Sequence, residues 1–595
     1  MQEFQGLQLE IRSGAADRGA AAALAQSLAL SPLIAQILVA RGITEEVSAR
    51  RFLSPSLKDG LADPHQIKNM RAGAELIIEA VQQGLQITVY SDFDVDGITS
   101  GTQLLLYLRS LGAKVNSYIP SRHTEGYGLQ RSALEKLVKA GTQLLVTLDC
   151  GITSVNEIAF ARRVGMKTVV VDHHQPAEIL PPADVIIDPA QGGCPFADYH
   201  LAAAGLTWML LVVLRRVAEE KGIEISECHD PKAYLDLAAL GTICDMVPLR
   251  DINRVISFRG LEMLNKMPKR IGVQALCDVA GISESRDIGS GAIGFNIGPR
   301  INAAGRMGEA KEVIDLLTTG DRKKAKTLAG RLDRFNVERQ NAEEWMKIHG
   351  VSVCQEKLAA GEVFSLAVFN DKFHVGVIGI VAQRLMEKFY LPAAVMAPGE
   401  EMVSGELTRV IKGSVRSVRG FNVAEVLKNM DDVLIRGGGH ESAGGFTLET
   451  ARLEQFIARF EAEAQKVFAG VRPERCVSVD AEVGLREIDI TVVGALQKLA
   501  PFGIGNPTPV FFSKDVEVCN VSAIGQNHAR LRLKQGDAVH QAVLWGGAGH
   551  PLLRIGRMVD VVFQPELNSY KGITSVQLNL RHVVEPGSVV VERSG

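Results

Sequence analysis

The feature that most constrains the fold lies between residues 85 and 189, where short apolar runs alternate with amphipathic segments of helical spacing. Strands are expected at 85–92, 114–122, 142–151 and 166–174, with one more at 183–189, and helices at 97–113, 129–141 and 154–165. Such alternation is typical of a parallel α/β sheet. Because ligands of these sheets bind beyond the carboxyl ends of the strands, a site is expected at that edge.

Acidic side chains gather at the end of the first expected strand. The run VYSDFDVDG places Asp92, Asp94 and Asp96 directly after apolar residues. A single Asp-rich turn is usually a solvated turn, but three carboxylates this close would raise one another's pKa values and weaken the fold. A bound divalent cation would offset that repulsion, so the run favours a metal site.

Later segments add further potential ligands. Asp149 ends the strand VTLD, Asp172, His173 and His174 follow the apolar run VVV, and Asp245 stands in the otherwise apolar GTICDMVPL. A strand-terminal Asp is commonly a helix cap, yet an Asp among apolar residues is costly unless it is paired or bound to metal.

Oxygen-rich ligation with one imidazole suits Mn²⁺ or Mg²⁺ better than zinc or iron. The expected ligands of two such ions are Asp94, Asp96, Asp149, His173 and Asp245. Two ions of this kind indicate hydrolysis of a phosphorus–oxygen bond.

Glycine-rich and basic segments offer candidate phosphate-binding groups. In RGGGHESAGG, the bare backbone of Gly438 and Gly439 can approach a phosphate closely, and Arg436 and His440 can donate to it. The segment lacks the Lys-Ser/Thr ending of an NTP-binding loop, so ATP use is not expected. Alone, such a segment is more often a flexible turn. Further candidate donors are Ser414, Arg416 and Ser417 in IKGSVRS, Arg122 in IPSRHTEGYG, and Arg300 and Arg306 in GPRINAAGRMG, although a lone arginine is more often a surface ion-pair partner.

The 595 residues are too many for one hydrophobic core, and composition changes along the chain suggest several domains. The expected order is an N-terminal helical region (1–80), a parallel-sheet α/β domain (81–308), a connector helix (309–360), a smaller α/β domain (361–470) and a C-terminal all-β domain of OB type (471–595). The β-domain could bind single strands through Arg530, Arg532 and Trp545. For Trp545, however, a core position is the favoured interpretation.

Composition narrows the class of protein. The net charge of −3 indicates no overall electrostatic affinity for nucleic acid, although a local basic groove would be enough to bind it. The scattered cysteines form no CxxC pair, so neither a zinc module nor a disulfide framework is indicated. No signal pattern or apolar run of membrane-spanning length is found, and a cytoplasmic location is expected.

Taken in order, the motifs SDFDVDG, LDC, VDHH and GTICDMVPL closely resemble the DHH phosphoesterase superfamily. The later GPRINAAGRMG, IKGSVRS and RGGGHESAGGF look like its DHHA1 companion domain. Together with the N-terminal helices and the β-domain, the combination is similar to the RecJ family of bacterial exonucleases specific for single-stranded DNA. This resemblance covers nearly the whole chain.

The resemblance implies residue roles. Asp94 and Asp96 match the family's first-motif ligands, Asp149 would bridge both ions, and Asp245 would complete the second site. His173 would be a ligand, His174 would contact the scissile phosphate or its leaving group, and Asp172 would orient the imidazoles. Many relatives have His where this chain has Tyr90, so one ligand position stays open, with Asp92 or water as candidates.

The resemblance also implies 5′→3′ digestion to 5′-mononucleotides, a role in repair and recombination, and recruitment by single-strand-binding protein and a RecQ-type helicase. Arg122, Ser414 and Arg416 are expected to hold the 5′ phosphate. A monomer is expected from the domain count. The alternatives are a DHH enzyme acting on short or cyclic nucleotides or polyphosphate, a non-catalytic DNA-binding scaffold, and a dehydrogenase-like protein, which would need a Gly-rich fingerprint where this chain has aspartates.

Overall fold

The computed structural model of the chain describes residues 8–12, 18–121, 125–126, 128–266, 268–283, 287–403, 406–570 and 572–593. The chain divides into two compact units. The larger combines Gln8–Asp333 with Val477–Gly595, and the smaller is built on Arg334–Cys476. Among the helices in the described ranges, none combines the length and the apolar character needed to cross a membrane.

A parallel sheet forms the centre of the larger unit. Its strands are β2 (Ile87–Ser91), β3 (Val115–Tyr118), β4 (Leu144–Leu148), β5 (Lys167–Val171) and β6 (Val185–Ile187), in the spatial order β3-β2-β4-β5-β6. All neighbouring strands run parallel, with Val89 opposite Val146 and Val146 opposite Val169. The expected parallel α/β sheet is therefore confirmed, and the carboxyl ends of these strands share one edge.

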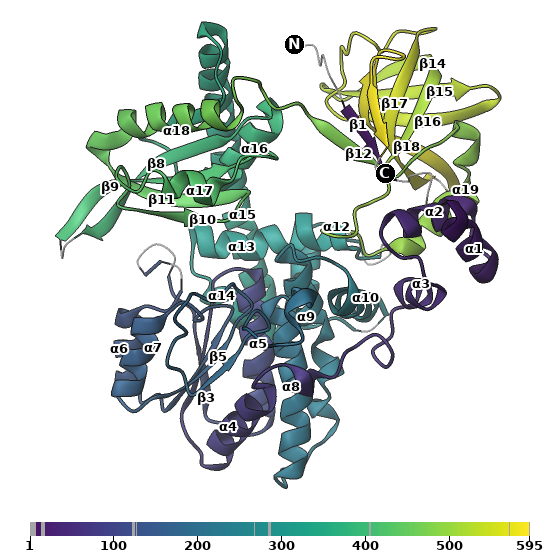
Figure 1. Cartoon of the computed structure of the whole chain (residues 1–595). Coiled ribbons are helices and arrows are strands. Elements are labelled where there is room, and N and C mark those ends of the chain that lie inside the picture. The colour runs from purple at the N-terminus through teal and green to yellow at the C-terminus, as the bar shows by residue number, and fades with distance from the viewer. Residues whose placement is uncertain are drawn as a thin grey trace. The chain divides into compact units, whose positions relative to one another are not determined.

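Helices cover both faces of this sheet. Successive strand residues point to opposite sides, and both sides carry apolar side chains that the helices bury. Val89, Val146 and Val169 pack with α4 (Met70–Gln82), α5 (Val95–Ser110) and α8 (Ala203–Glu220). Tyr90, Leu145 and Val170 pack with α6 (Arg131–Lys139) and α7 (Val155–Arg163) on the other face (Figure 1). Burial on both sides explains why these strands read as continuous apolar runs.

The sheet domain continues through a series of helices: α9 (Leu235–Cys244), α10 (Asp251–Lys266), α11 (Ile271–Val279), α12 (Ser290–Ala292), the π-helical turn η6 (Ile293–Ile297), α13 (Gly298–Met307) and α14 (Lys311–Thr318). The helix α15 (Arg322–Ala360) follows and belongs to both units. The segment expected to be one connector helix is thus two helices, with a break at residues 319–321.

The C-terminal β-domain also lies in the larger unit. Its main sheet follows the order β13-β14-β15-β16-β18-β17, and β14 also pairs with β17, which closes the sheet on itself as a barrel requires. The strands are β13 (Ala481–Glu482), β14 (Phe511–Ile524), β15 (His528–Gln535), β16 (Ala538–Leu544), β17 (Met558–Tyr570) and β18 (Ile573–Val584), with helix α19 (Ile490–Leu496) beside them. On β15, Leu531 and Leu533 are buried while Arg530 and Arg532 are exposed.

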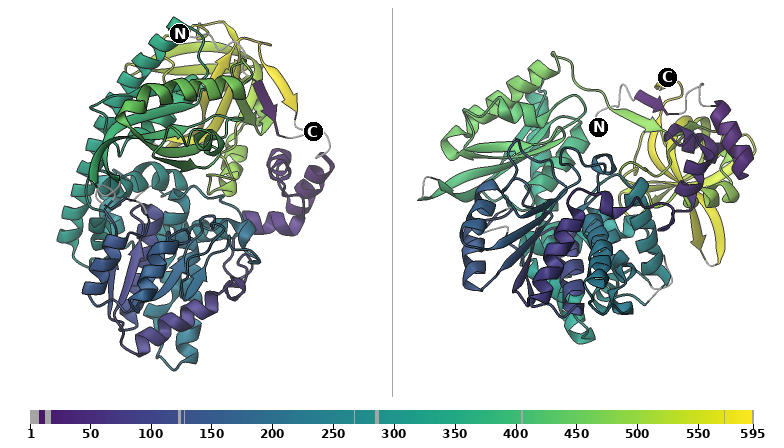
Figure 2. Two further views of the ribbon diagram at one scale, coloured as in Figure 1. Left: turned by 60° about the vertical axis from the view of Figure 1, so that its left-hand side comes forward. Right: turned by 60° about the horizontal axis from the view of Figure 1, so that its bottom comes forward.

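The N-terminal segment packs against this C-terminal domain. Strand β1 (Gln8–Ile11) pairs with β19 (Val590–Arg593) and β12 (Cys476–Val479). Apolar residues of α1 (Arg18–Leu28), α2 (Pro32–Ala40) and α3 (Glu46–Leu53) share one core with the barrel strands. Both turned views in Figure 2 show the purple N-terminal strand beside the yellow C-terminal strands. The expected helical region therefore contains a strand, and its last helix, α4, belongs to the parallel-sheet core.

The smaller unit is a second α/β domain. Its sheet has the order β10-β11-β9-β8-β7, in which only β7 and β8 run parallel among the described strands. The strands are β7 (Leu366–Phe369), β8 (Ala393–Val403), β9 (Glu406–Arg416), β10 (Arg436–Gly439) and β11 (Ala443–Glu449). Helices α15 and α16 (Ile378–Phe389) pack on one face, and α17 (Val423–Lys428) and α18 (Leu453–Val467) pack on the other.

Candidate metal centre

An aspartate directly follows each of the neighbouring strands β2, β4, β5 and β6. These residues are Asp92, Asp149, Asp172 and Asp188. Because the strands are parallel and adjacent, the fold places these carboxylates in a row along the carboxyl edge of the sheet. All of them are buried, with at most 3% of their surface exposed.

One group of potential metal ligands combines Asp92, Asp94 and Asp149, whose donor atoms all lie within 4.8 Å of one another. Asp94 begins helix α5, and one of its carboxylate oxygens accepts a hydrogen bond from the backbone N–H of Gly97 at 3.0 Å. This hydrogen bond caps the helix and fixes the Asp94 carboxylate where the chain passes from β2 into α5.

A second group of potential ligands combines Asp96, His173 and Asp245, again within 4.8 Å of one another. Asp96 accepts hydrogen bonds from the backbone N–H groups of Ala203 (2.7 Å) and Ala204 (2.8 Å) at the start of α8. Asp245 ends α9. The two groups adjoin each other, because the Nε2 atom of His173 lies 3.1 Å from an oxygen of Asp149. All five expected ligands and Asp92 therefore lie in one cluster.

The electrostatics of this cluster fit divalent cations. Burial, with added repulsion from Asp94, raises the pKa of Asp96 to about 7. Burial, with added repulsion from Asp96 and Asp94, raises the pKa of Asp245 to about 9. The pKa of Asp149 is raised for the same reasons. Burial lowers the pKa of His173 to about 4, so its imidazole is neutral and can donate a lone pair. Crowded carboxylates beside a neutral imidazole are a donor set that Mn²⁺ or Mg²⁺ would stabilise.

Asp172 positions both histidines and contacts the imidazole of His174 directly. Its Oδ1 atom lies 2.7 Å from Nδ1 of His174 and accepts the backbone N–H of His173, and its Oδ2 atom accepts the N–H of Ile152. Burial alone would lower the pKa of His174, but the Asp172 contact and charge outweigh it and raise that pKa to about 9. Asp172 thus fixes the imidazole and favours its protonated form.

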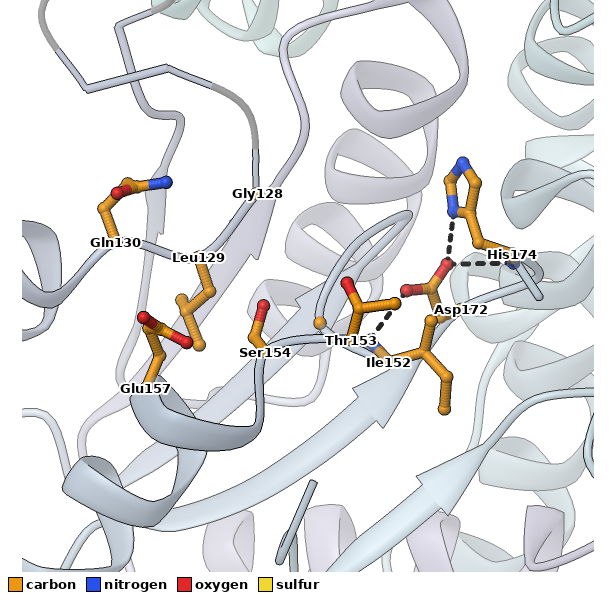
Figure 3. A pocket seen from close by; sticks show the side chains of 10 residues that line it. Gly128, Leu129, Gln130, Ile152, Thr153, Ser154, Glu157, Asp172 and His174 are labelled. Carbon is orange, nitrogen blue, oxygen red and sulfur yellow. Dashed lines mark hydrogen bonds and ion pairs between the residues drawn. The ribbon is translucent and has the colours of Figure 1, made fainter. Parts of the chain in front are cut away.

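A polar pocket of about 220 Å³ opens beside this pair. Figure 3 shows His174 and Asp172 on one side of the pocket, with Ser154, Glu157 and Gln130 on the other. Ser154 and Glu157 come from the start of α7, and Gln130 precedes α6. His174 therefore stands between the ligand cluster and a space open to a substrate.

Strained backbone occurs at two of the cluster's segments. Asp149 has φ +62° and Met246, which follows Asp245, has φ +64°. Residues other than glycine seldom adopt this left-handed conformation, and when they do they are concentrated at functional sites. The strain is consistent with segments shaped for ligand placement.

Three family models match successive domains of the chain. Residues 86–242 match the DHH family N-terminal domain, residues 357–466 match the DHHA1 domain, and residues 479–582 match the RecJ OB domain. Among curated relatives, the single-stranded-DNA-specific exonuclease RecJ of Haemophilus influenzae is 30% identical over 577 residues, covering 95% of this chain and 98% of the relative. The chain belongs to the RecJ family.

Further members of the RecJ family support this assignment. The exonuclease RecJ of Bacillus subtilis is 34% identical over 520 residues, which cover 87% of this chain but 63% of the relative. The crystal structure of RecJ from Thermus thermophilus in complex with Mn²⁺ has a TM-score of 0.82 and 28% identity, covering 99% of this chain and 81% of that chain. Its Mg²⁺ complex has a TM-score of 0.74 at 27% identity, covering 99% and 80%. The expected fold class and nuclease family are confirmed.

Tyr90 stands at the ligand position that the sequence left open. The Tyr90 side chain is buried, its hydroxyl donates to the backbone carbonyl of Gly128 at 2.9 Å, and its ring stacks on Tyr118. The Tyr90 hydroxyl is therefore bonded to the backbone, and this bond gives it no role as a metal ligand. Asp92, whose carboxylate lies within the cluster, is the nearer candidate for the open ligand position.

The candidate arginines of the larger unit differ in their surroundings. Arg300 contacts Asp333 at 2.9 Å and donates to the carbonyls of Asn296 and Val279, so it ties helices together. This set of contacts favours a structural role over the expected substrate contact. Arg306 lies in the last turn of α13. Arg122 lies outside the described residues.

The candidate phosphate-binding residues of the smaller unit form a compact group only in part. Arg416 donates to the hydroxyl of Ser414 at 3.0 Å, and both lie beside the start of α16. Ser417 is buried, and its hydroxyl donates to the carbonyl of Phe421. The exposed strand β10 carries Arg436, Gly438 and Gly439, followed by His440, and Arg436 pairs with Glu401 at 2.9 Å.

Asp188 was not among the residues predicted from the sequence. It is fully buried, its Oδ1 atom accepts the N–H of Ala190, and burial raises its pKa to about 7. The sequence does contain a pattern that indicates Asp188. The run VIID is an apolar strand ending in Asp, like the runs that end in Asp149 and Asp172.

Proposed function

We propose that this protein is a metal-dependent exonuclease that digests single-stranded DNA in the 5′→3′ direction to 5′-mononucleotides, in DNA repair and recombination. The observation that carries the proposal is the convergence of Asp92, Asp94, Asp96, Asp149, His173 and Asp245 on one edge of the sheet. Membership of the RecJ family supplies the substrate class, because its named members are single-stranded-DNA-specific exonucleases.

The ligand cluster would hold two Mn²⁺ or Mg²⁺ ions, with Asp149 between the two donor groups. When bound, such ions activate a water molecule and neutralise charge on the scissile phosphate. The protein's own contribution is preorganisation. The N–H groups of Ala203 and Ala204 fix Asp96, and the N–H of Gly97 fixes Asp94, before any substrate arrives.

His174 is the group proposed to meet the substrate. Its raised pKa keeps the imidazolium available as a hydrogen-bond donor at neutral pH, and Asp172 holds the ring through Nδ1. The Nε2–H group would donate to an oxygen of the scissile phosphate or to the leaving 3′-oxygen of the terminal nucleotide. A donor placed where negative charge develops stabilises the transition state more than the ground state.

Arg416 and Ser414 are proposed to hold the 5′ phosphate and so set the direction of digestion. Arg416 is partly buried and, among the described residues, makes no ion pair with a carboxylate. Burial lowers its pKa, and an anionic partner such as a phosphate would stabilise the charged guanidinium there. Each cleavage to a 5′-mononucleotide leaves a new 5′ phosphate on the remaining strand, so the same pocket would bind the strand in each successive round of cleavage.

The activity is tested with end-labelled DNA. Purified protein is incubated with single and double strands in Mn²⁺, in Mg²⁺ or with a chelator, and products are separated by length. The proposal predicts mononucleotides released from the 5′ end of single strands, little digestion of duplex and none with chelator. Release from the 3′ end, or digestion that survives chelation, would contradict it.

The 5′-phosphate pocket is tested with Arg416→Ala. The ratio of rates on 5′-phosphorylated and 5′-hydroxyl single strands is measured for the wild type, for this variant and for Arg409→Ala, an exposed arginine on the same strand β9. We expect Arg416→Ala to bring the ratio close to one and Arg409→Ala to preserve it. An unchanged ratio in Arg416→Ala would reject the pocket.

Other expectations from the sequence stay predictions: the domain boundaries, the monomeric state, the cytoplasmic location, and recruitment by single-strand-binding protein and a RecQ-type helicase. The alternative of a small-nucleotide enzyme predicts slow digestion of long strands, and the same end-labelled assay distinguishes it.

A further inference from the structure

An aromatic side chain projects into solvent from the turn that leads into helix α13. Phe295 is 84% exposed, whereas its neighbours Ile293 and Ile297 are fully buried. These residues form the π-helical turn η6, a rare conformation that is frequent at functional sites. The buried isoleucines anchor the turn, and the phenyl ring is left without the burial that usually stabilises a phenylalanine.

The turn is joined to the metal centre through the helix that follows it. It leads into α13, where a Cβ atom on Gly298 would lie 2.6 Å from the sulfur of Cys244, and one on Gly305 would lie 2.9 Å from the carbonyl oxygen of Phe93. Cys244 precedes Asp245, and Phe93 stands between Asp92 and Asp94. Helix α13 therefore packs against segments of both ligand groups, and Phe295 lies within one helical turn of that contact.

Two other exposed apolar side chains come from adjoining segments. Met246, 67% exposed, follows the ligand Asp245, and Ile504, 47% exposed, lies in the segment before β14. The N–H of Leu249 donates to the carbonyl of Ile504 at 2.7 Å, and the hydroxyl of Ser290 donates to the carbonyl of Phe502 at 2.6 Å. We refer to Met246, Phe295 and Ile504 as the apolar rim. Met246 directly follows Asp245, Phe295 precedes α13, and Ile504 comes from a loop hydrogen-bonded to the segments that contain these two residues.

The position of the turn favours single-stranded nucleic acid as the occupant of this surface. Residues 288–308 contain Arg300 and Arg306, but Arg300 is paired with Asp333, and Asp287 and Glu309 flank the segment, so it carries no strong charge of its own. A single strand held at the neighbouring metal centre would bring flat bases to the exposed ring, which can stack on any of them.

We propose that Phe295 stacks on a nucleobase of the single strand whose phosphate lies at the metal centre, with Met246 and Ile504 contacting the adjoining bases. This inference rests on the proposed exonuclease function and assigns a strand-positioning residue to it. Because every base has a flat face, the contact tolerates any sequence. It would act on the affinity and alignment of the strand rather than on the ions.

The test combines variants with substrates that lack single bases. Steady-state kinetics are measured in Mn²⁺ for the wild type, Phe295→Ala, Phe295→Trp and the control Val47→Ala, which removes an exposed apolar side chain on α3. The substrates are 5′-phosphorylated single strands in which one abasic residue is moved through the first eight positions. Thermal unfolding of each variant shows whether the fold is retained.

We expect Phe295→Ala to raise KM about fivefold to tenfold with kcat little changed, the scale of losing one base–aromatic stack. In the wild type, an abasic residue at one or two adjacent positions should raise KM to the same extent, and in Phe295→Ala it should add nothing there. Phe295→Trp should restore the wild-type pattern, and Val47→Ala should preserve it.

Other results would overturn the inference. A wild-type KM in Phe295→Ala, abasic effects that add fully to the variant's defect at every position, or a lowered melting temperature that accounts for the defect would each reject stacking. The last result would mean that the ring packs against protein. If the wild type does not digest single strands at all, the proposed function fails instead, and the two failures are therefore distinguishable.

Discussion

The Nε2 atom of His173 lies 3.1 Å from a carboxylate oxygen of Asp149. This contact joins the two groups of potential ligands, Asp92–Asp94–Asp149 and Asp96–His173–Asp245, into one cluster. His173 is neutral at physiological pH because burial lowers its pKa, so it cannot offset the negative charge around it. The folded chain therefore concentrates carboxyl groups that keep their protons to a higher pH when no cation is bound, and whose ionised forms divalent cations would neutralise.

Removal of the carboxylate at this junction should abolish turnover. We expect Asp149→Ala to lower kcat by at least about 10²–10³-fold, the scale of losing one preorganised electrostatic contact. Binding of single-stranded DNA should largely survive, because the ions contribute more to the transition state than to the strand-binding surface. Rates come from the end-labelled assay and affinities from fluorescence anisotropy. The matched control is Asp198→Ala, an exposed aspartate of the same domain. Near-normal rates in Asp149→Ala would remove this residue from the centre.

The stability of the metal-free protein should fall as the pH rises. Folding raises the pKa of Asp96 to about 7 and that of Asp245 to about 9, from an ordinary 3.8. A carboxyl group with a raised pKa favours the folded state below pH 3.8, and this advantage is lost as the pH rises through the folded pKa. The melting temperature in chelator should therefore decrease between about pH 4 and about pH 9.

Added Mn²⁺ should oppose this decrease, because it binds the ionised carboxylates of the folded state. The gain in melting temperature from Mn²⁺ should be larger at pH 9 than at pH 5, and Asp245→Asn should flatten the metal-free profile. A metal-free protein equally stable at both pH values would show that these carboxylates are not crowded.

Loss of the Asp172 carboxylate should impair His174 without removing the ions. In Asp172→Asn, the charge that holds the imidazolium is lost, while an acceptor oxygen for the backbone N–H groups remains. We expect kcat to fall about 10–100-fold, as for other residues that orient catalytic side chains, with Mn²⁺ affinity measured by calorimetry little changed. The double variant with His174→Gln should be no worse than His174→Gln alone. Additive losses would mean that the two residues act separately.

Close packing behind Asp96 should make Gly241 intolerant of a side chain. A Cβ atom at Gly241 would meet Ala204 and Thr99 and would lie 2.7 Å from a carboxylate oxygen of Asp96. Gly241→Ala should lower the free energy of unfolding by about 1–3 kcal/mol, as overpacking of a core does, and should weaken Mn²⁺ binding.

The control for this packing effect is Gly330→Ala, because the same helical substitution on α15 meets nothing within 4 Å. It should be neutral or slightly stabilising in a denaturant titration. Equal effects of the two substitutions would show that Gly241 is not packed against the centre.

The parts of the site set by local pattern could be predicted from the sequence. The apolar runs before Asp92, Asp149 and Asp172 define both the strands and the edge where the acids meet, because a parallel sheet brings its carboxyl ends together. Asp245 was found for a related reason, as an acid among apolar residues.

The parts that depend on distant contacts could not be predicted. Arg300 is engaged by Asp333, and the helices α1–α3 share a core with barrel strands more than 400 residues later, which no local pattern indicates. Trp545 was expected in the core, and this prediction is wrong because the side chain is 61% exposed. Its aromatic character alone did not indicate which face of the strand end it occupies.

The most direct test of the metal centre is anomalous diffraction from crystals soaked in Mn²⁺. The account predicts two manganese peaks about 3.5–4 Å apart, both within bonding distance of Asp149, one also beside His173 and Asp245. A single peak, or peaks that lie away from Asp149, would contradict it.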